Sequence, residues 1–267
     1  MKRYRSILTF GFIFIAFLTK AQDNSVLSEG TWYKLAILED GMYKIDGTDL
    51  SSYGILLNDL EASKIRIFGH GQGMLPQANS AARPIDLHEV AIQLSPGAAE
   101  GFDIEDYILF YGEGPDKFKY DSTANRYLYE KNLYSDTAYY YLNINLTEGK
   151  RVQPLDEITG SYPEISTYWD GFAHELDQFN VLKSGREWYG EVFDLDLNQT
   201  FETDILDIVS TSNIIIESAV MAASPQASTF DIFSGGDLIG TQNLNPVPSG
   251  TYSIKGDLSN EVFSFTS

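Results

Sequence analysis

Residues 31–45 read TWYKLAILEDGMYKI, and this stretch decides the fold class. In its first half, apolar side chains recur at every second position: Tyr33, Leu35 and Ile37. This period is typical of a β-strand with one buried face. The polar triplet at residues 39–41 then predicts a turn, and residues 42–45 predict a second strand, so we expect a β-hairpin here.

The same alternation continues along the first half of the chain, between turns rich in Gly, Asp and Pro. Further strands are predicted at residues 64–68, 90–94, 107–111 and 138–146. Thr48 is expected to cap one helical turn that stops at Gly54. Because the chain shows no long 3.6-residue period, the pattern predicts a mostly β fold with β-sandwich-like domains.

The second half repeats this organisation after a stretch of low apolar content. We expect an N-terminal β domain over residues 22–150, a linker over residues 151–164, and a second β domain over residues 165–267. The chain stops inside an alternating run, residues 261–266, which leads us to expect that the protein continues past Ser267 and that the second domain is truncated.

Three patterns predict strands and turns inside the second domain. Apolar residues alternate over residues 189–197 and again over residues 214–220. The tetrapeptide Ser-Gly-Gly-Asp at residues 234–237 predicts a tight hairpin turn, since glycine accepts the positive φ angles that such turns need.

Residues 1–21 have the parts of a secretory signal peptide. A positive start is followed by an apolar stretch, residues 7–18, and by Ala21 as the small residue before the expected cut. A spanning helix needs about 20 apolar residues, so this stretch is too short for a confident anchor. We expect an exported protein that begins at Gln22 and lies at the cell surface; an uncleaved anchor or a buried N-terminal helix is the alternative.

Charge and cysteine content exclude several functions. The chain has a net charge of −20, and removal of residues 1–21 takes away four basic and no acidic residues, which leaves −24. So acidic a surface repels nucleic acid and anionic lipid. The chain has no cysteine, which excludes disulfides, thiolate metal sites and a cysteine nucleophile within these residues.

No catalytic constellation stands out. The run Gly69-His70-Gly71-Gln72-Gly73 lacks the spacing of a dinucleotide loop and is interpreted as a tight loop. His70, His88 and His174 are too far apart in sequence for zinc-ligand spacing, and no serine lies in a nucleophile elbow. Chance carboxylate pairs are abundant among 38 acidic residues, so none is singled out.

One segment has the alternating oxygen ligands of a calcium loop. Asp194, Asp196 and Asn198 occupy alternate positions, but the following glycine is missing and Ile205 stands where the bidentate glutamate belongs. A strand with a solvent-facing polar side is the favoured interpretation. We therefore expect no cofactor, with calcium at this segment as the alternative.

Several stretches, taken in order, resemble the type IX secretion system sortases of the PorU type, which are related to gingipain-like cysteine peptidases. Those in the first half are residues 26–34, 39–45, 65–69, 73–76, 106–116 and 134–136. The most specific stretch comes later and consists of Ser184, Gly185, Arg186, Glu187, Trp188, Tyr189, Gly190 and Glu191. The signature segment, as we call residues 184–191, completes a resemblance that spans roughly residues 26 to 267.

The resemblance implies a non-catalytic β region that precedes the protease domain of the family. The catalytic His and Cys of these enzymes lie further along the chain, so no histidine here takes that role. The full-length form is expected to cleave C-terminal sorting signals from secreted cargo and to attach the cargo to surface lipopolysaccharide. Other secretion components or cargo sorting domains are the expected partners, and contact with the outer membrane would run through them.

Two other functions remain open from the sequence. The chain is alternatively a stand-alone surface module that binds glycan or protein, with Trp32, Trp169 and Trp188 as platforms, or an inhibitory prodomain. In the signature segment we expect Arg186 to pair with Glu187 or Glu191 at a strand end, which is a structural role. Trp188 and Tyr189 would then point to opposite faces of that strand.

Overall fold

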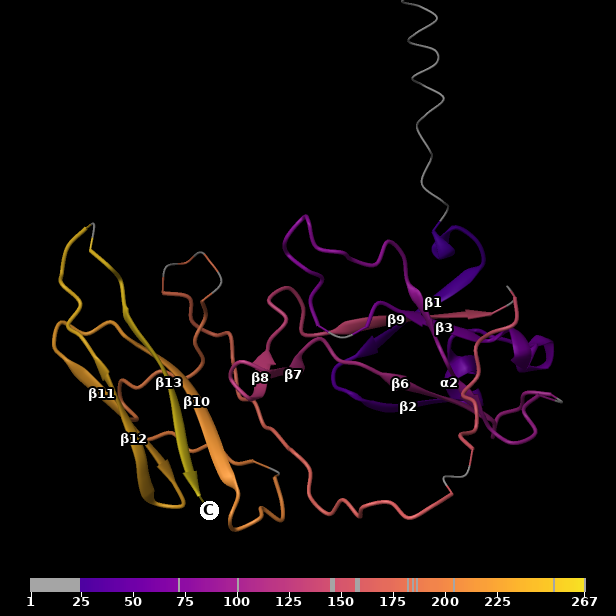
Figure 1. The fold of residues 1–267 in the computed structure, drawn as a ribbon. Helices are drawn as coiled ribbons and strands as arrows, with labels where there is room; N and C mark the ends of the chain where they lie inside the picture. Colours follow the sequence, from indigo (N-terminus) through magenta and orange to yellow (C-terminus); the bar gives the residue numbers. More distant parts are fainter. Residues whose placement is uncertain are drawn as a thin grey trace, which may run out of the picture. The chain divides into compact units, whose positions relative to one another are not determined.

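The computed structural model describes residues 25–266 except positions 72, 100, 145, 146, 157, 158, 182, 184, 186, 204 and 252 (Figure 1). The predicted signal peptide and its cut lie outside the described residues. The chain divides into two compact units, Met1–Gly160 and Ser161–Ser267. The fold is mostly β, as predicted, and all of its paired strands are antiparallel. The predicted domain and linker limits stay predictions.

The first unit contains two sheets and a separate hairpin. The four-stranded sheet has the order β1 (Thr31–Ile37), β9 (Ala138–Ile144), β3 (Arg66–Gly69) and β4 (His88–Val90). The three-stranded sheet has the order β2 (Gly41–Asp46), β6 (Tyr107–Gly112) and β5 (Gln93–Leu94). The hairpin consists of β7 (Lys117–Asp121) and β8 (Arg126–Glu130).

Alternate side chains of both sheets meet in one core. The four-stranded sheet contributes, among others, Leu35, Ile37, Ile67, Tyr140 and Leu142. The three-stranded sheet contributes Ile45, Ile108 and Phe110. Each of these side chains is at most 8% exposed, so the two sheets form a sandwich with a well-buried interior.

The predicted hairpin over residues 31–45 was wrong, because its two strands belong to different sheets. β1 pairs with β9 and β2 pairs with β6. The turn between them carries the chain across the sandwich: the Asp40 carboxylate accepts a hydrogen bond from the Gly114 amide at 2.7 Å, and the Tyr43 hydroxyl donates to the Glu39 carbonyl at 2.8 Å. The alternation was interpreted correctly, but it does not say which strand is the partner.

The predicted strand over residues 90–94 is likewise split between the sheets as β4 and β5. Between them, Ile92 is fully buried and forms a parallel bridge with Arg151. The guanidinium of Arg151 donates to the carbonyls of Ile65, Ala62 and Ser63, which holds this part of the chain against residues 62–65 of the same unit.

The helical turn is present as α2 (Gly47–Ser52), but the predicted cap was wrong. Asp46 is the cap: its carboxylate accepts hydrogen bonds from the Thr48 and Asp49 amides at 3.0 and 3.1 Å. The Asp49 carboxylate in turn accepts a hydrogen bond from the Asp46 amide at 3.1 Å, which completes a capping box. Thr48 therefore lies inside the turn. Three short 3₁₀ segments flank these elements: η1 (Val26–Ser28), η2 (Leu57–Asp59) and η3 (Ala62–Lys64).

The second unit contains two ribbons, β10 (Asn213–Ala222) with β13 (Asp257–Thr266) and β11 (Ser228–Ser234) with β12 (Asp237–Leu244). The predicted turn at residues 234–237 is confirmed, with Gly235 and Gly236 at φ values of +60° and +97°. Gln242 of β12 is 1% exposed and donates to the carbonyls of Ser218 and Ser259, at 3.1 Å each, so it links the two ribbons.

The predicted strand over residues 189–197 was wrong. In the described part of residues 161–212, the pairing is limited to an isolated bridge between Phe179 and Tyr189. Leu195 and Leu197 are 95% and 68% exposed, so the apolar face that the alternation predicted is not buried. Asp194 and Asp196 instead accept hydrogen bonds from nearby backbone amides, which favours a turn over a strand.

Candidate functional site

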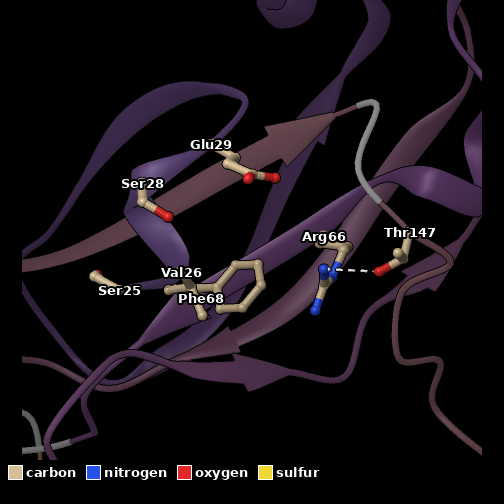
Figure 2. Close-up of a pocket in the computed structure, with 7 residues that line it drawn as sticks. All are labelled: Ser25, Val26, Ser28, Glu29, Arg66, Phe68 and Thr147. Atoms are coloured by element: carbon tan, nitrogen blue, oxygen red, sulfur yellow. Dashed lines mark hydrogen bonds between the residues drawn. The ribbon is translucent and has the colours of Figure 1, made fainter. Parts of the chain in front are cut away.

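A small hollow lies against the outer face of the four-stranded sheet (Figure 2). Its volume is about 350 Å³, and its lining comes from three places in the sequence. The segment around η1 supplies four residues, β3 supplies two, and the chain after β9 supplies one. The lining residues are Ser25, Val26, Ser28, Glu29, Arg66, Phe68 and Thr147.

Asp86 holds the η1 segment over the sheet. Its carboxylate accepts a hydrogen bond from the Val26 amide at 2.6 Å and another from the Ser25 hydroxyl at 3.0 Å. The backbone bonds from Val26 and Leu87 lower the pKa of the Asp86 carboxyl below its usual value. The carboxylate form is therefore the one that fastens the segment at neutral pH.

Arg66 forms the charged side of the hollow. Its guanidinium lies 2.7 Å from the Glu89 carboxylate, donates to the Thr147 hydroxyl at 3.0 Å, and covers the Phe68 ring at 4.6 Å from the centroid. Trp32 packs edge-on against the same ring at 5.2 Å. Phe68 is thus held between neighbours and gives the hollow a rigid apolar wall.

Glu89 is the main counter-charge of Arg66. Burial raises the pKa of the Glu89 carboxyl, but hydrogen bonds from the Arg66 guanidinium and the Lys150 amide outweigh it, so the net pKa is below the usual value. The side chains of Arg66 and Glu89 are 17% and 10% exposed. A pair this buried stays ionised because each partner neutralises the other.

Two buried side-chain atoms of the four-stranded sheet have no hydrogen-bond partner: Nε of Arg66, which lines the hollow, and Oδ1 of Asn143, which does not. The two residues are direct cross-strand partners on β3 and β9. The Asn143 amide nitrogen already donates to the Thr31 carbonyl at 3.1 Å, and Asn143 is fully buried. An unsatisfied donor and an unsatisfied acceptor therefore occupy neighbouring positions, and each such buried group costs free energy.

The signature segment lies elsewhere, in the second unit, and Ser184 and Arg186 are outside the described residues. The expected pairing of Arg186 therefore stays a prediction. Tyr189 does not lie in a regular strand, and Trp188 is 44% exposed. The prediction that these two aromatic residues stand on opposite faces of a strand was therefore wrong.

Tyr189 of the signature segment is tied to a residue ten positions earlier in the chain. The Tyr189 backbone exchanges hydrogen bonds of 2.8 and 2.9 Å with Phe179. Gly185 has a φ of +89°, and a Cβ at Gly190 would lie 3.1 Å from the Cβ of Leu176.

The end of the signature segment makes a side-chain hydrogen-bond contact of its own. Glu191 lies 2.6 Å from Nε2 of His174, and the imidazole packs on Phe201 with 4.7 Å between the ring centroids. Burial, with the nearby Glu187 charge, raises the pKa of the Tyr189 hydroxyl. These contacts support a structural role for the described residues of the segment.

The other residues considered for chemistry are not brought together. His88 is exposed at the start of β4, beside Glu89. Across the part of the chain that the structure describes, no three His, Asp or Glu side chains are grouped so as to hold a metal ion. Calcium near Asp194 stays an untested expectation. Among the same residues, no helix is long and apolar enough to cross a membrane.

Sequence reasoning missed the hollow. Arg66 does carry a signal, since a cation between the buried Ile65 and Ile67 must stand on the outer face of a strand. Asp86 and Thr147 carry none, because their importance depends on which distant segments they meet.

Comparisons with known proteins found similarity at the level of structure. No family model matches the chain, and no curated protein matches it. A solved structure described as dimeric latent PorU from Porphyromonas gingivalis matches with a TM-score of 0.56 over 94% of this chain. The chain therefore has a PorU-like fold. The two sequences are 20% identical, so the likeness concerns the fold alone, and the chain spans 23% of the length of that PorU chain.

Proposed function

We propose that this chain is the N-terminal, non-catalytic region of a type IX secretion system sortase. The observation that carries the proposal is the PorU-like fold, which extends over 94% of the chain and so includes both units. The matched part is 23% of the PorU chain, which leaves room in such a protein for a separate protease domain.

Two features of the sequence support the same assignment. The ordered set of stretches from residue 26 onward resembles the same family, and the chain has no cysteine to serve as the nucleophile of a gingipain-like peptidase. In this proposal the full-length form cleaves C-terminal sorting signals from cargo and attaches the cargo to surface lipopolysaccharide, while this region contributes folding, docking or assembly.

The proposed location follows from the same assignment. The region would be exported and held at the cell surface, with other secretion components or cargo sorting domains as its partners. Its charge of −24 without residues 1–21 disfavours direct adsorption to anionic lipid, so contact with the outer membrane would run through those partners.

Reading the open reading frame past residue 267 tests the proposal. We expect an α/β domain that contains both a cysteine and a histidine. A stop codon or a run of adhesion repeats would instead support a stand-alone surface module. If the protease domain is present, a purified 22–267 chain that inhibits it when added in trans would support the inhibitory prodomain.

A biochemical assay complements this reading. Purified residues 22–267 should neither cleave nor transfer a sorting-domain substrate, and thiol-directed reagents should label nothing, because the chain has no cysteine. Turnover that survives a second purification would contradict the non-catalytic assignment.

A further inference from the structure

We propose that residues 153–177, the acidic segment, dock on a partner protein that presents an apolar groove bordered by Lys and Arg side chains. The acidic segment combines a backbone outside any sheet, large apolar side chains in solvent, and negative charge without a single Lys or Arg. This docking surface goes beyond the proposed function and does not depend on it.

The backbone of the acidic segment belongs to no regular element. Its described residues contain no helix, strand or bridge, and isolated bridges flank it at Arg151 and Phe179 (Figure 1). Pro154 and Pro163 lack an amide donor, which disfavours a helix or a central strand here. A segment of this kind suits binding in a groove of another protein, where its backbone bonds to the partner and its side chains serve as anchors.

Three large apolar side chains of the acidic segment lie almost entirely in solvent. Leu155, Ile165 and Tyr168 are 85%, 84% and 86% exposed. Single exposed apolar residues are ordinary on a protein surface, but a group of them marks an interaction site. Docking would remove these side chains from water, which is the main driving force of most protein association.

The charge of the acidic segment specifies the rim of the partner groove. The segment carries six Asp and Glu residues and no Lys or Arg. Asp156 follows Leu155, and Glu164 precedes Ile165, so two of the apolar anchors have a carboxylate next to them in the sequence. Basic side chains around an apolar groove would complement this pattern, and such complementarity speeds association and selects the partner.

The same charge disfavours other occupants. Nucleic acid and anionic lipid are repelled by so acidic a segment. A second copy of the chain is itself acidic, with 38 acidic and 18 basic residues, which makes it a poor source of a basic rim. A basic groove on a different protein is therefore the occupant that fits both the anchors and the charge.

The absence of cysteine allows a specific test, because one introduced cysteine is the only thiol within residues 22–267. Ile165→Cys reports on the acidic segment. Ile85→Cys is the matched control, since Ile85 is also 84% exposed but lies outside the segment. Each variant is labelled with N-ethylmaleimide, both as purified residues 22–267 and in intact cells that produce the protein from its own gene.

Mass spectrometry then measures the rate of labelling at the introduced cysteine. In cells, Ile165→Cys should react about tenfold more slowly than in the purified chain, because at an occupancy of about nine-tenths only the unbound fraction reacts. The ratio of the two rates is taken relative to that of Ile85→Cys, which should react equally fast in both settings.

A charge reversal tests the basic rim. Asp156→Lys together with Glu164→Lys, added to Ile165→Cys, should restore in cells the rate of the purified chain. The matched control is Asp59→Lys together with Glu105→Lys, which changes the net charge by the same amount at exposed positions outside the acidic segment. This control should leave Ile165→Cys protected.

Four results would overturn the proposal. Equal rates for Ile165→Cys in cells and in the purified chain would mean that nothing covers the acidic segment. Equal slowing of Ile165→Cys and Ile85→Cys in cells would mean general shielding rather than a docked partner. Protection that survives the charge reversal would mean that the groove has no basic rim. Slowing in the purified chain that grows with its concentration would make a second copy the occupant.

Discussion

Strand β9 and the segment over residues 189–197 have the same alternating pattern but different structures. In β9, Tyr140 and Leu142 are 2% and 0% exposed, and the strand has a partner on each side, β1 and β3. In the other segment, Leu195 and Leu197 are 95% and 68% exposed and no strand forms. Alternation makes a strand where a second layer buries the apolar face and a neighbour accepts the backbone hydrogen bonds.

Acidic residues explain part of the difference. Asp194 and Asp196 directly precede the two leucines of residues 189–197, and their carboxylates accept hydrogen bonds from the amides of Leu195 and Asn198, which competes with a sheet ladder. In β9 the residues between the core positions are tyrosines and Asn143, which suit a sheet. Burial of the apolar face therefore decides the outcome, and local polar bonds reinforce it.

The largest expected effect on stability is the difference between substituting a buried leucine of β9 and an exposed leucine of residues 189–197. Leu142→Ala should lower the free energy of unfolding by about 3–4 kcal/mol, because it leaves a cavity between the two sheets. Leu195→Ala should change it by less than about 0.5 kcal/mol, since that side chain is in solvent. Urea denaturation followed by circular dichroism measures both, and equal losses would contradict the comparison.

The next effect concerns ion pairs of different burial. Arg66→Met should cost about 2 kcal/mol, because Glu89 is left buried without its partner. Lys64→Met breaks the exposed pair with Glu61 and should cost less than about 1 kcal/mol. If the two variants unfold at the same denaturant concentration, the Arg66 pair does not stabilise the sheet as described.

Lowering the pH should remove the contribution of the Glu89 carboxylate to the stability of the folded state. Its pKa is lowered in the folded state, so the stabilisation is complete above the unfolded value of about 4.3 and is lost as the pH falls through the lower folded value. Glu89→Gln should therefore cost about 1.5 kcal/mol at pH 7 and much less at pH 3. Thermal unfolding of both proteins at the two pH values tests this, and a pH-independent difference would refute it.

The smallest expected effect tests the signature segment. Gly190→Ala places a Cβ 3.1 Å from the Cβ of Leu176, and we expect a loss of about 1 kcal/mol. Gly101→Ala is the control, since its Cβ would meet nothing within 4 Å. Differential scanning calorimetry should show a lower transition for Gly190→Ala alone; a neutral result would mean that the loop is not packed on Leu176.

The sequence predicted individual strands better than their partners. The pattern located β1, β2, β6 and β9 to within one or two residues, and the two glycines at residues 235 and 236 defined a hairpin. It did not show that residues 39–41 cross between sheets, since alternation fixes a buried face and not a neighbour.

The hairpin of β7 and β8 was also missed, although its partners carry a signal. Phe118 lies opposite Tyr129, and Tyr120 lies opposite Tyr127, with 5.3 and 5.4 Å between the ring centroids. Such aromatic cross-strand pairs are readable from the sequence only once the turn is placed; in the structure that turn includes Asn125, whose φ is +53°.

The hollow could not have been predicted from the sequence. It forms where Ser25, Arg66 and Thr147 meet, and these residues are 41 to 122 positions apart in the chain. The hydrogen bond from the Val26 amide to the Asp86 carboxylate holds the η1 side of the hollow, and it joins residues that are 60 positions apart. Long-range assembly of this kind leaves no local pattern in composition or spacing.

The proposed function rests on this region being needed by a larger sortase while doing no chemistry itself. An in-frame deletion of residues 31–266 from the chromosomal gene, with residues 1–30 kept, tests that claim in living cells. Immunoblots of a secreted cargo protein should then show an uncleaved sorting domain, and expression of wild-type full-length protein from a plasmid should restore cleavage. Cargo that is still cleaved and attached to the surface in the deletion strain, with the shortened protein present at normal levels, would contradict the account.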